Sequence, residues 1–294
     1  MTRQPVGETV AHGEALERKL DELLTKLRGK KGVLVALSGG VDSSLVAYLA
    51  KKALGDRAMA VTADSATLPP GELDGARRIA DRIGIRHVVI KVNELRNPDF
   101  ARNPPERCYY CKKELIAELK RIAAEEGMDT IVDGTNADDL RGHRPGAVAL
   151  REEGVYSPLA DVGLTKDEVR ALARMLGLPT ADKPSMACLA SRFPYGQRIT
   201  AERLSRVAEA ERFVRSVVGV RQVRVRDHGD IARIEVGRDE RRLLFDESLM
   251  DAIAKRLRSL GFTYVTMDVE GYREGSMDEA LRGASPPRKA RRRR

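Results

Sequence analysis

Apolar residues along the first 180 positions recur at two alternating spacings, which predicts helices and strands in turn. Leucines in the segment 14–28 stand three or four residues apart, as on one face of a helix. The segment 33–37 is a short apolar run typical of a buried strand. Further helices are predicted over 43–54, 72–83, 111–126 and 165–176, further strands over 58–62, 87–92 and 130–133, and a loop over 93–105. This alternation favours a Rossmann-like α/β fold with a parallel sheet covered on both faces.

The pattern changes near residue 200. Two short strands, 222–226 and 231–236, are separated by the turn sequence 227–230, and helices are predicted over 201–217 and 248–260, with a last strand over 263–269. This part resembles a small α+β domain. The expected division is a nucleotide-binding sheet domain over 14–180, a loop over 181–199 that carries Cys188, an α+β domain over 200–275 and a basic tail over 276–294.

Composition narrows the class of protein. The chain has 294 residues and is 42% hydrophobic, but no apolar stretch reaches the roughly 20 residues of a membrane helix. The segment 1–13 lacks the apolar core of a secretory signal, so a cytoplasmic, membrane-free protein is expected. A homo-oligomer is expected as well.

The net charge of +9 is concentrated at one end of the chain. Residues 286–294 carry six positive charges, which leaves +3 for the rest. A solvated tail is one interpretation, and attraction to RNA or to an acidic partner is the other. Tryptophan is absent and aromatic residues make up 4%, so base-stacking surfaces are scarce and nucleic acid is not the expected partner.

The most informative segment follows the predicted strand 33–37 and reads Ser38-Gly39-Gly40-Val41-Asp42-Ser43-Ser44. Glycines let backbone N–H groups approach an anion, and the next helix adds its N-terminal donors and partial positive charge. The serine hydroxyls add further donors, whereas Asp42 beside a phosphate requires an intervening Mg²⁺. The segment lacks the lysine of a Walker A motif, which excludes kinase and motor types. The alternative is an ordinary glycine-rich turn.

The Ser-Gly-Gly-Val-Asp-Ser sequence resembles the signature of the PP-loop ATP pyrophosphatases. The resemblance implies a fold of the adenine nucleotide alpha-hydrolase type and an enzyme that adenylylates a substrate oxygen and releases pyrophosphate. It extends to 133–139, where Gly134, Thr135 and Asn136 are expected near the nucleotide and Asp138 or Asp139 near metal or substrate. The alternative for this stretch is a helix N-terminus capped by Asn136.

Three cysteines are present, Cys108, Cys111 and Cys188, and their odd number does not indicate a disulfide framework. Cys108 and Cys111 form a C-x-x-C at a predicted helix start, which places both thiols on one face and is expected to lower their pKa values. A zinc site completed by a histidine, inert buried thiols and a reactive cysteine all remain open from the residues alone.

Residues 107–112 and 187–196, the latter reading Ala-Cys-Leu-Ala-Ser-Arg-Phe-Pro-Tyr-Gly, resemble segments of the LarE family, and the likeness covers about 16–272. That family thiolates a pyridinium dicarboxylate mononucleotide during assembly of the nickel-pincer nucleotide cofactor of lactate racemase. The resemblance implies either that Cys188 gives up its own sulfur, or that all three cysteines hold a [4Fe-4S] cluster with one open iron. The sulfur donor that would recharge such a cluster is not indicated.

Several basic residues are candidates for anion binding. Arg224 and Arg226 share one face of a predicted strand, and the resemblance implies that this pair binds the substrate phosphate. Arg192 and Arg198 flank Cys188 and are further candidates, and Lys112 is a candidate phosphate ligand beside Cys111. The alternative for each is plain solvation.

The expected function is therefore an ATP-dependent sulfur transferase that uses ATP, Mg²⁺ and a [4Fe-4S] cluster on a small nucleotide substrate. Cys188, Asp42 and Asp139 are the expected catalytic residues. A tRNA thiolase of the same superfamily, an ammonia-using amide ligase and a non-catalytic nucleotide sensor are the alternatives. The thiolase requires salt-sensitive tRNA binding, the ligase requires no cysteine, and the sensor releases no pyrophosphate.

Overall fold

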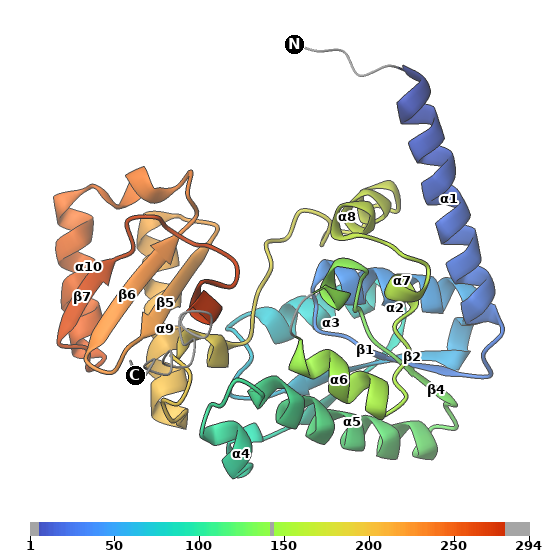
Figure 1. Cartoon of the computed structure of the whole chain (residues 1–294), viewed down its shortest axis with the longest axis horizontal. Helices are drawn as coiled ribbons and strands as arrows, with labels where there is room; N and C mark the ends of the chain where they lie inside the picture. Colours follow the sequence, from blue (N-terminus) through green and yellow to red (C-terminus); the bar gives the residue numbers. More distant parts are fainter. Residues whose placement is uncertain (1–5, 142–143, 280–294) are drawn as a thin grey trace, which may run out of the picture. The chain divides into compact units, whose positions relative to one another are not determined.

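The computed structural model describes residues 6–141 and 144–279, with side chains from residue 13 onward (Figure 1). The basic segment 286–294 lies outside the described residues. Two compact units divide the chain: unit 1 runs to Cys188 and takes in Arg198–Thr200, and unit 2 comprises Leu189–Gln197 and the residues from Ala201 onward. Cys188 is thus the last residue of unit 1 before the chain enters unit 2.

Unit 1 is built on a four-stranded parallel sheet. Its strands are β1 (Val33–Ala36), β2 (Ala58–Asp64), β3 (Arg86–Lys91) and β4 (Thr130–Val132). They lie in the order β3-β2-β1-β4, with Val33 opposite both Ala58 and Thr130. The predicted Rossmann-like α/β fold is confirmed. Since β1 is central, the loop that follows it lies in the middle of the sheet's carboxyl edge.

Successive side chains of β1 point to opposite faces of this sheet. Val33 and Val35 belong to one buried core, and Leu34 belongs to the other. The helices that contribute residues to the Val33 core are α1 (Val6–Arg28), α2 (Val41–Leu54), α3 (Glu72–Ile83), α7 (Pro158–Asp161) and α8 (Lys166–Met175). The opposite face is covered by α5 (Arg107–Glu125), which packs against α6 (Pro145–Glu152) (Figure 1).

Helix termini were predictable where the capping residues stand in the sequence. Gly84 ends α3 in the left-handed conformation, with φ of 72°. Thr165 forms the expected capping box with Glu168 at the start of α8. These two local signals depend on no distant contact, which is why the sequence suffices to place them.

Three short helices that begin with proline were not predicted. The segment 93–105 was expected to be a loop, but it contains the 3₁₀ turn η2 (Glu94–Arg96) and the short helix α4 (Pro98–Ala101). α4 is capped by Asn97, whose side chain accepts the Asp99 N–H at 2.8 Å. Helices α6 and α7, which were not predicted, each begin with proline, a residue favoured at the first helical position. α5 begins at Arg107 rather than 111, so both cysteines of the C-x-x-C lie inside it.

Unit 2 contains a three-stranded sheet of β5 (Val223–Asp227), β6 (Ile231–Val236) and β7 (Tyr264–Met267), flanked by α9 (Ala201–Val218) and α10 (Glu247–Ser259). β5 and β6 form the predicted hairpin, and β7 pairs with β6 in parallel. Apolar residues of the two helices and of β5 and β6 form one core. This is the expected small α+β fold. Among the described residues, no helix is both long and apolar enough to span a bilayer.

Candidate functional site

The phosphate loop, residues 38–44, is a tight bend between β1 and α2. The Ser43 hydroxyl organises it by accepting the Ser38 N–H at 3.2 Å and by lying 3.1 Å from the Ser38 hydroxyl. Gly39 has φ of 75°, and a Cβ on it would lie 3.1 Å from the backbone nitrogen of Ala76 on α3. Both features require glycine at this position. The bend therefore exposes backbone at the N-terminus of α2, where the helix dipole favours an anion.

The loop after β4 packs directly on the phosphate loop. A Cβ on Gly134 would lie 2.6 Å from the backbone nitrogen of Ser43, so no other residue fits without displacing the loop. The structure thus gives Gly134 a packing role in addition to its expected place near the nucleotide. Thr135 and Ser157 both donate hydrogen bonds to the buried carboxylate of Asp133, which fixes the turn.

Asn136 connects the two loops. Its side-chain nitrogen donates to Asp42 at 3.0 Å, and its side-chain oxygen accepts the N–H groups of Asp138 and Asp139 at 2.9 and 3.2 Å. Asn136 thus accepts the N–H groups of the 3₁₀ turn η3 (Asp138–Leu140), but the N-cap residue of this turn is Ala137, and a nucleotide contact of Asn136 stays a prediction. The Asp139 carboxylate accepts the Asn136 N–H and lies 3.5 Å from Arg144.

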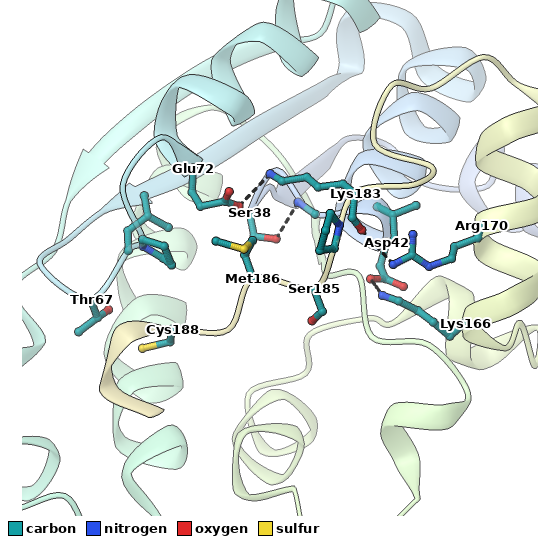
Figure 2. Close-up of a pocket in the computed structure, with 15 residues that line it drawn as sticks. Ser38, Asp42, Thr67, Glu72, Lys166, Arg170, Lys183, Ser185, Met186 and Cys188 are labelled. Atoms are coloured by element: carbon teal, nitrogen blue, oxygen red, sulfur yellow. Dashed lines mark hydrogen bonds and ion pairs between the residues drawn. The ribbon is translucent and has the colours of Figure 1, made fainter. Parts of the chain in front are cut away.

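A cavity of about 280 Å³ opens at the phosphate loop (Figure 2). Figure 2 shows Thr67 and Cys188 on one side of it and Lys166 and Arg170 on the other. The described residues that line it are Ser38, Gly40, Val41, Asp42, Thr67, Leu68, Pro69, Glu72, Lys166, Arg170, Lys183, Pro184, Ser185, Met186 and Cys188. The structure thereby brings Cys188 to the same cavity as Ser38 and Asp42, although the sequence separates them by more than 140 positions.

Three cations that sequence reasoning missed line this cavity. Lys166 forms an ion pair with Asp42, and Lys183 donates to Glu72 at 2.8 Å. Arg170 donates to the backbone carbonyl of Lys183 at 2.9 Å. All three follow the last strand of the sheet, on α8 or just after it, and no local motif marks them. Only the tertiary fold shows that they face the phosphate loop.

The three thiols lie near one another in unit 1. Burial raises the pKa of the Cys111 thiol far above its usual range, and the charges of Cys188, Glu94 and Cys108 raise it further. The expected lowering of this pKa by the helix N-terminus is therefore wrong for the free Cys111 thiol, because desolvation outweighs the dipole. Cys108 and Cys188 are exposed, so these two are not inert buried thiols.

The three thiols are close enough for the charges of Cys108 and Cys188 to raise the pKa of Cys111, and thiolates are the ligands of iron–sulfur clusters. Within residues 6–141 and 144–279, however, no three His, Cys, Asp or Glu side chains already stand in an arrangement that could hold a metal ion. Binding a cluster therefore requires the cysteine side chains to reorient.

A buried carboxylate lies beside the thiols and was not predicted. Glu94 is 5% exposed, and its Oε1 accepts a hydrogen bond from the Thr67 hydroxyl at 3.1 Å. Its Oε2 has no hydrogen-bond partner in the described part of the chain. Glu94 follows β3 and Thr67 follows β2, so the carboxyl edge of the sheet brings them together.

The candidate arginines of unit 2 are buried rather than solvated. Arg192, Arg224 and Arg226, which we name the arginine cluster, are 0%, 1% and 4% exposed. Arg192 makes a bidentate ion pair with Glu211 at 2.7 and 3.0 Å, and Arg226 pairs with Glu235 at 2.6 Å. The solvated-surface interpretation is wrong for these three residues.

The neighbouring guanidinium groups of the arginine cluster affect the pKa of Arg224. Burial and then the charge of Arg192 lower the pKa of Arg224 to about 10, Glu211 and Tyr272 oppose the shift, and Arg226 adds to it. Arg224 stacks over the Tyr272 ring at 5.3 Å. An anion bound at Arg224 would therefore relieve repulsion among three guanidinium groups.

The remaining candidates, Arg198, Lys112 and Ser44, have different surroundings. Arg198 is exposed and belongs to unit 1. Lys112 lies on α5, where a Cβ on Gly146 would be 3.4 Å from its Cγ, and it is not among the described residues that line the cavity. Ser44 is fully buried, and its hydroxyl has no hydrogen-bond partner among the residues described.

Comparisons with known proteins agree with this geometry. The NAD synthase family model matches residues 13–107, which include the phosphate loop. An uncharacterized protein of Synechocystis sp. is 44% identical over 90% of this chain and 99% of its own length. The pyridinium-3,5-bisthiocarboxylic acid mononucleotide synthase of Lactiplantibacillus plantarum is 38% identical over 90% of this chain and 96% of its own length. One subunit of the glutamine-hydrolyzing GMP synthase of Methanococcus maripaludis is 30% identical over 56% of each chain.

Proposed function

Because the chain belongs to the LarE-type family of PP-loop, ATP-dependent sulfur transferases, we propose that it converts the carboxylates of pyridinium-3,5-dicarboxylate mononucleotide into thiocarboxylates. The observation that carries the proposal is the cavity that Cys188 shares with Ser38 and Asp42. A sulfur nucleophile and a phosphate-binding bend beside one cavity suit a reaction in which the same carboxylate meets ATP first and sulfur second.

The chemistry has two balanced steps. A substrate carboxylate oxygen bonds to the α-phosphorus of ATP, and pyrophosphate leaves. Sulfur then bonds to the acyl carbon of the mixed anhydride, and AMP leaves with the former carboxylate oxygen. The phosphate loop, with the backbone of Gly39 and Gly40 and the hydroxyls of Ser38 and Ser43, stabilises the charge of the departing pyrophosphate.

Mg²⁺ is assigned to the Asp42 carboxylate, with Asp139 as the second candidate ligand. Asp42 is 19% exposed and pairs with Lys166. If the Asp42 carboxylate held the cation, which would supply positive charge beside the phosphates, Lys166 would be free to contact the nucleotide. Asn136 keeps its hydrogen bond to Asp42 in this scheme and fixes the carboxylate. The backbone of 134–136 contacts the nucleotide, and Ser44 and Lys112 remain as candidates.

The substrate phosphate is assigned to Arg224 and Arg226, with Arg192 and Arg198 as further candidates. The mutual repulsion at Arg224 supports the assignment. Arg192 is held by its ion pair with Glu211, and Arg226 by its ion pair with Glu235. These pairs preorganise the guanidinium groups for an anion.

Sulfur delivery is assigned to the cysteines. Cys108, Cys111 and Cys188 would hold a [4Fe-4S] cluster, which supplies sulfide at the iron that no cysteine ligates. α5 fixes Cys108 and Cys111 one turn apart, and Cys111 is half-buried. If no cluster is held, the exposed Cys188 thiol bonds to the acyl carbon as AMP leaves, and elimination of the Cα proton then breaks the Cβ–Sγ bond, which releases the thiocarboxylate and leaves dehydroalanine at position 188, once per molecule.

The test begins with anaerobic purification and assays of iron and acid-labile sulfide. We expect both in the wild type, with more than one thiocarboxylate formed per enzyme when sulfide is supplied. Cys188→Ala should still release pyrophosphate in the presence of substrate but form no thiocarboxylate, and Cys108→Ala should lose iron. An iron-free enzyme that stops after one turnover and loses the Cys188 sulfur would indicate sacrifice. A wild type that never releases pyrophosphate would overturn the function itself.

The same assay separates the alternatives. The similarity to a GMP synthase component favours an amide ligase as the second candidate, although it covers 56% of the chain. Release of AMP that depends on ammonia and survives Cys188→Ala would support the ligase. Release that depends on tRNA, with strong salt sensitivity of binding, would support a tRNA thiolase.

A further inference from the structure

Lys183 is a cation placed at the edge of an anion site. Its ammonium donates to the backbone carbonyl of Gly39 at 2.9 Å and to Glu72 at 2.8 Å, with its side chain 24% exposed (Figure 2). It lies over α3, where a Cβ on Gly75 would be 3.5 Å from the Lys183 nitrogen. Gly39 is the second residue of the phosphate loop and Lys183 lines the cavity, so Lys183 contacts the bend from the cavity side.

The surroundings of Lys183 favour an anionic ligand. Lys166, Arg170 and Lys183 face two carboxylates, Asp42 and Glu72, among the described residues that line the cavity, so these charged groups have an excess of one positive charge. Two helix N-termini, those of α2 and α3, add partial positive charge. A phosphate would neutralise this excess positive charge, whereas the Gly39 carbonyl is an uncharged acceptor for Lys183.

Lys183 also belongs to the segment that leads to Cys188. Four residues lie between the two positions. Arg170 donates to the carbonyls of Ala181 and Lys183, which anchors the start of the segment on α8. The Lys183 side chain extends from this anchor to the phosphate loop. A group that binds the Lys183 ammonium therefore also fixes the start of the segment 183–188. The last residue of this segment, Cys188, lines the cavity.

We propose that Lys183 binds the β- or γ-phosphate of ATP and thereby couples occupancy of the phosphate loop to the position of Cys188. The inference rests on one part of the proposed function, namely that ATP is the nucleotide that the protein binds. Without nucleotide, Gly39 and Glu72 hold the ammonium. With ATP bound, phosphate oxygens replace the Gly39 carbonyl as its partner, because an ionised acceptor makes a stronger hydrogen bond than a neutral one. Lys183 is a positioning residue for the sulfur step.

The first test is equilibrium binding of Mg-ATP and of AMP to Lys183→Met. Loss of one charge-assisted contact should weaken ATP binding about ten- to one hundredfold. AMP binding should change little, because AMP lacks the β- and γ-phosphates. Lys52→Met, on the exposed face of α2, is the matched control and should bind ATP normally. Unchanged ATP affinity in Lys183→Met would overturn the inference.

The second test measures Cys188 directly in iron-free full-length protein, whose thiols carry no cluster, by iodoacetamide labelling and peptide mass spectrometry, with the peptide of Cys108 and Cys111 as the internal reference. Saturating Mg-ATP should slow labelling of Cys188 in the wild type. The protection should be lost in Lys183→Met at an ATP concentration that saturates that variant. Equal protection in both proteins would mean that ATP shields Cys188 without Lys183, which contradicts the coupling.

Glu72→Gln separates a ligand role from a structural one. Glu72 is 8% exposed, so Lys183→Met leaves a buried carboxylate without its cation. Removing the carboxylate instead should leave ATP binding unchanged or tighter, and Lys183→Met combined with Glu72→Gln should melt like Glu72→Gln yet still bind ATP weakly. If Glu72→Gln weakens ATP binding as much as Lys183→Met, the ion pair is structural and the inference fails.

The inference and the proposed function can fail separately. A wild type that binds Mg-ATP but releases no pyrophosphate with the pyridinium substrate refutes the function, and the binding data on Lys183→Met still decide the role of Lys183. A wild type that forms thiocarboxylate, with Lys183→Met binding ATP normally, refutes only the role of Lys183.

Discussion

The phosphate loop and the arginine cluster are two ways to build a site for an anion. The phosphate loop offers backbone N–H groups, shaped by Gly39 and by the close approach of Gly134, and its charged neighbours are partly exposed. The arginine cluster offers guanidinium groups held by buried carboxylates. A site made of backbone depends on shape, so an added methyl group should damage it most. A site made of buried side chains depends on charge balance, so loss of a partner should damage it most.

The largest effect is expected at the base of the arginine cluster. Arg192→Met leaves the Glu211 carboxylate buried without its cation and should cost about 3–5 kcal/mol of unfolding free energy. Arg212→Met is the matched control, because Arg212 and Glu209 form an exposed ion pair worth about 1 kcal/mol or less. Urea unfolding followed by circular dichroism measures both. If the two variants lose the same stability, the cluster is not held by buried ion pairs.

The second effect concerns the shape of the phosphate loop. A methyl group on Gly134 would meet the Ser43 nitrogen at 2.6 Å, so Gly134→Ala should displace the loop. A shift of ~1 Å at a reacting centre can cost about one hundredfold in rate, so pyrophosphate release should fall by about that factor. Gly29→Ala, where the nearest atom would be 3.6 Å away, is the control and should keep normal release. Normal release by Gly134→Ala would show that the loop tolerates the shift.

The third effect separates the ligands of the two regions. Arg224→Gln should raise KM for the pyridinium mononucleotide about ten- to one hundredfold, since one charged hydrogen bond is lost. ATP affinity should not change, because Arg224 belongs to unit 2 and the phosphate loop to unit 1. Arg224→Lys should recover part of the affinity by retaining the charge. Steady-state kinetics with each ligand varied in turn provide the measurement, and parallel losses for both ligands would contradict the assignment.

The smallest effect is a pH dependence of stability in unit 2. Burial raises the pKa of the Asp227 carboxyl, but hydrogen bonds from Arg206 and Arg203 outweigh burial, so the pKa lies below its usual range. The folded state therefore binds this proton less readily than the unfolded state. The stability that Asp227 contributes is fully present above the ordinary aspartate pKa of about 3.9 and is lost as the pH falls through the lower folded value. Urea unfolding of wild type and Asp227→Asn between about pH 3 and pH 6 should show a shallower slope in the variant, and identical slopes would contradict this.

The sequence by itself determined the features that depend on neighbouring residues. The glycine bend before α2, the left-handed cap at Gly84 and the capping box at Thr165 all follow from local spacing, because the atoms involved lie within a few residues of one another. The same holds for the hairpin of β5 and β6.

Only the tertiary structure decided which distant groups meet. Lys166 and Lys183 face the phosphate loop because α8 packs against α2, and no pattern around either lysine indicates this. Arg192 and Arg226, for which solvation was the alternative to anion binding, are buried in ion pairs with Glu211 and Glu235. Burial also reversed the expected direction of the Cys111 pKa. Local sequence fixes backbone geometry through short-range sterics and hydrogen bonds, whereas burial and charge pairing are set by residues far away along the chain.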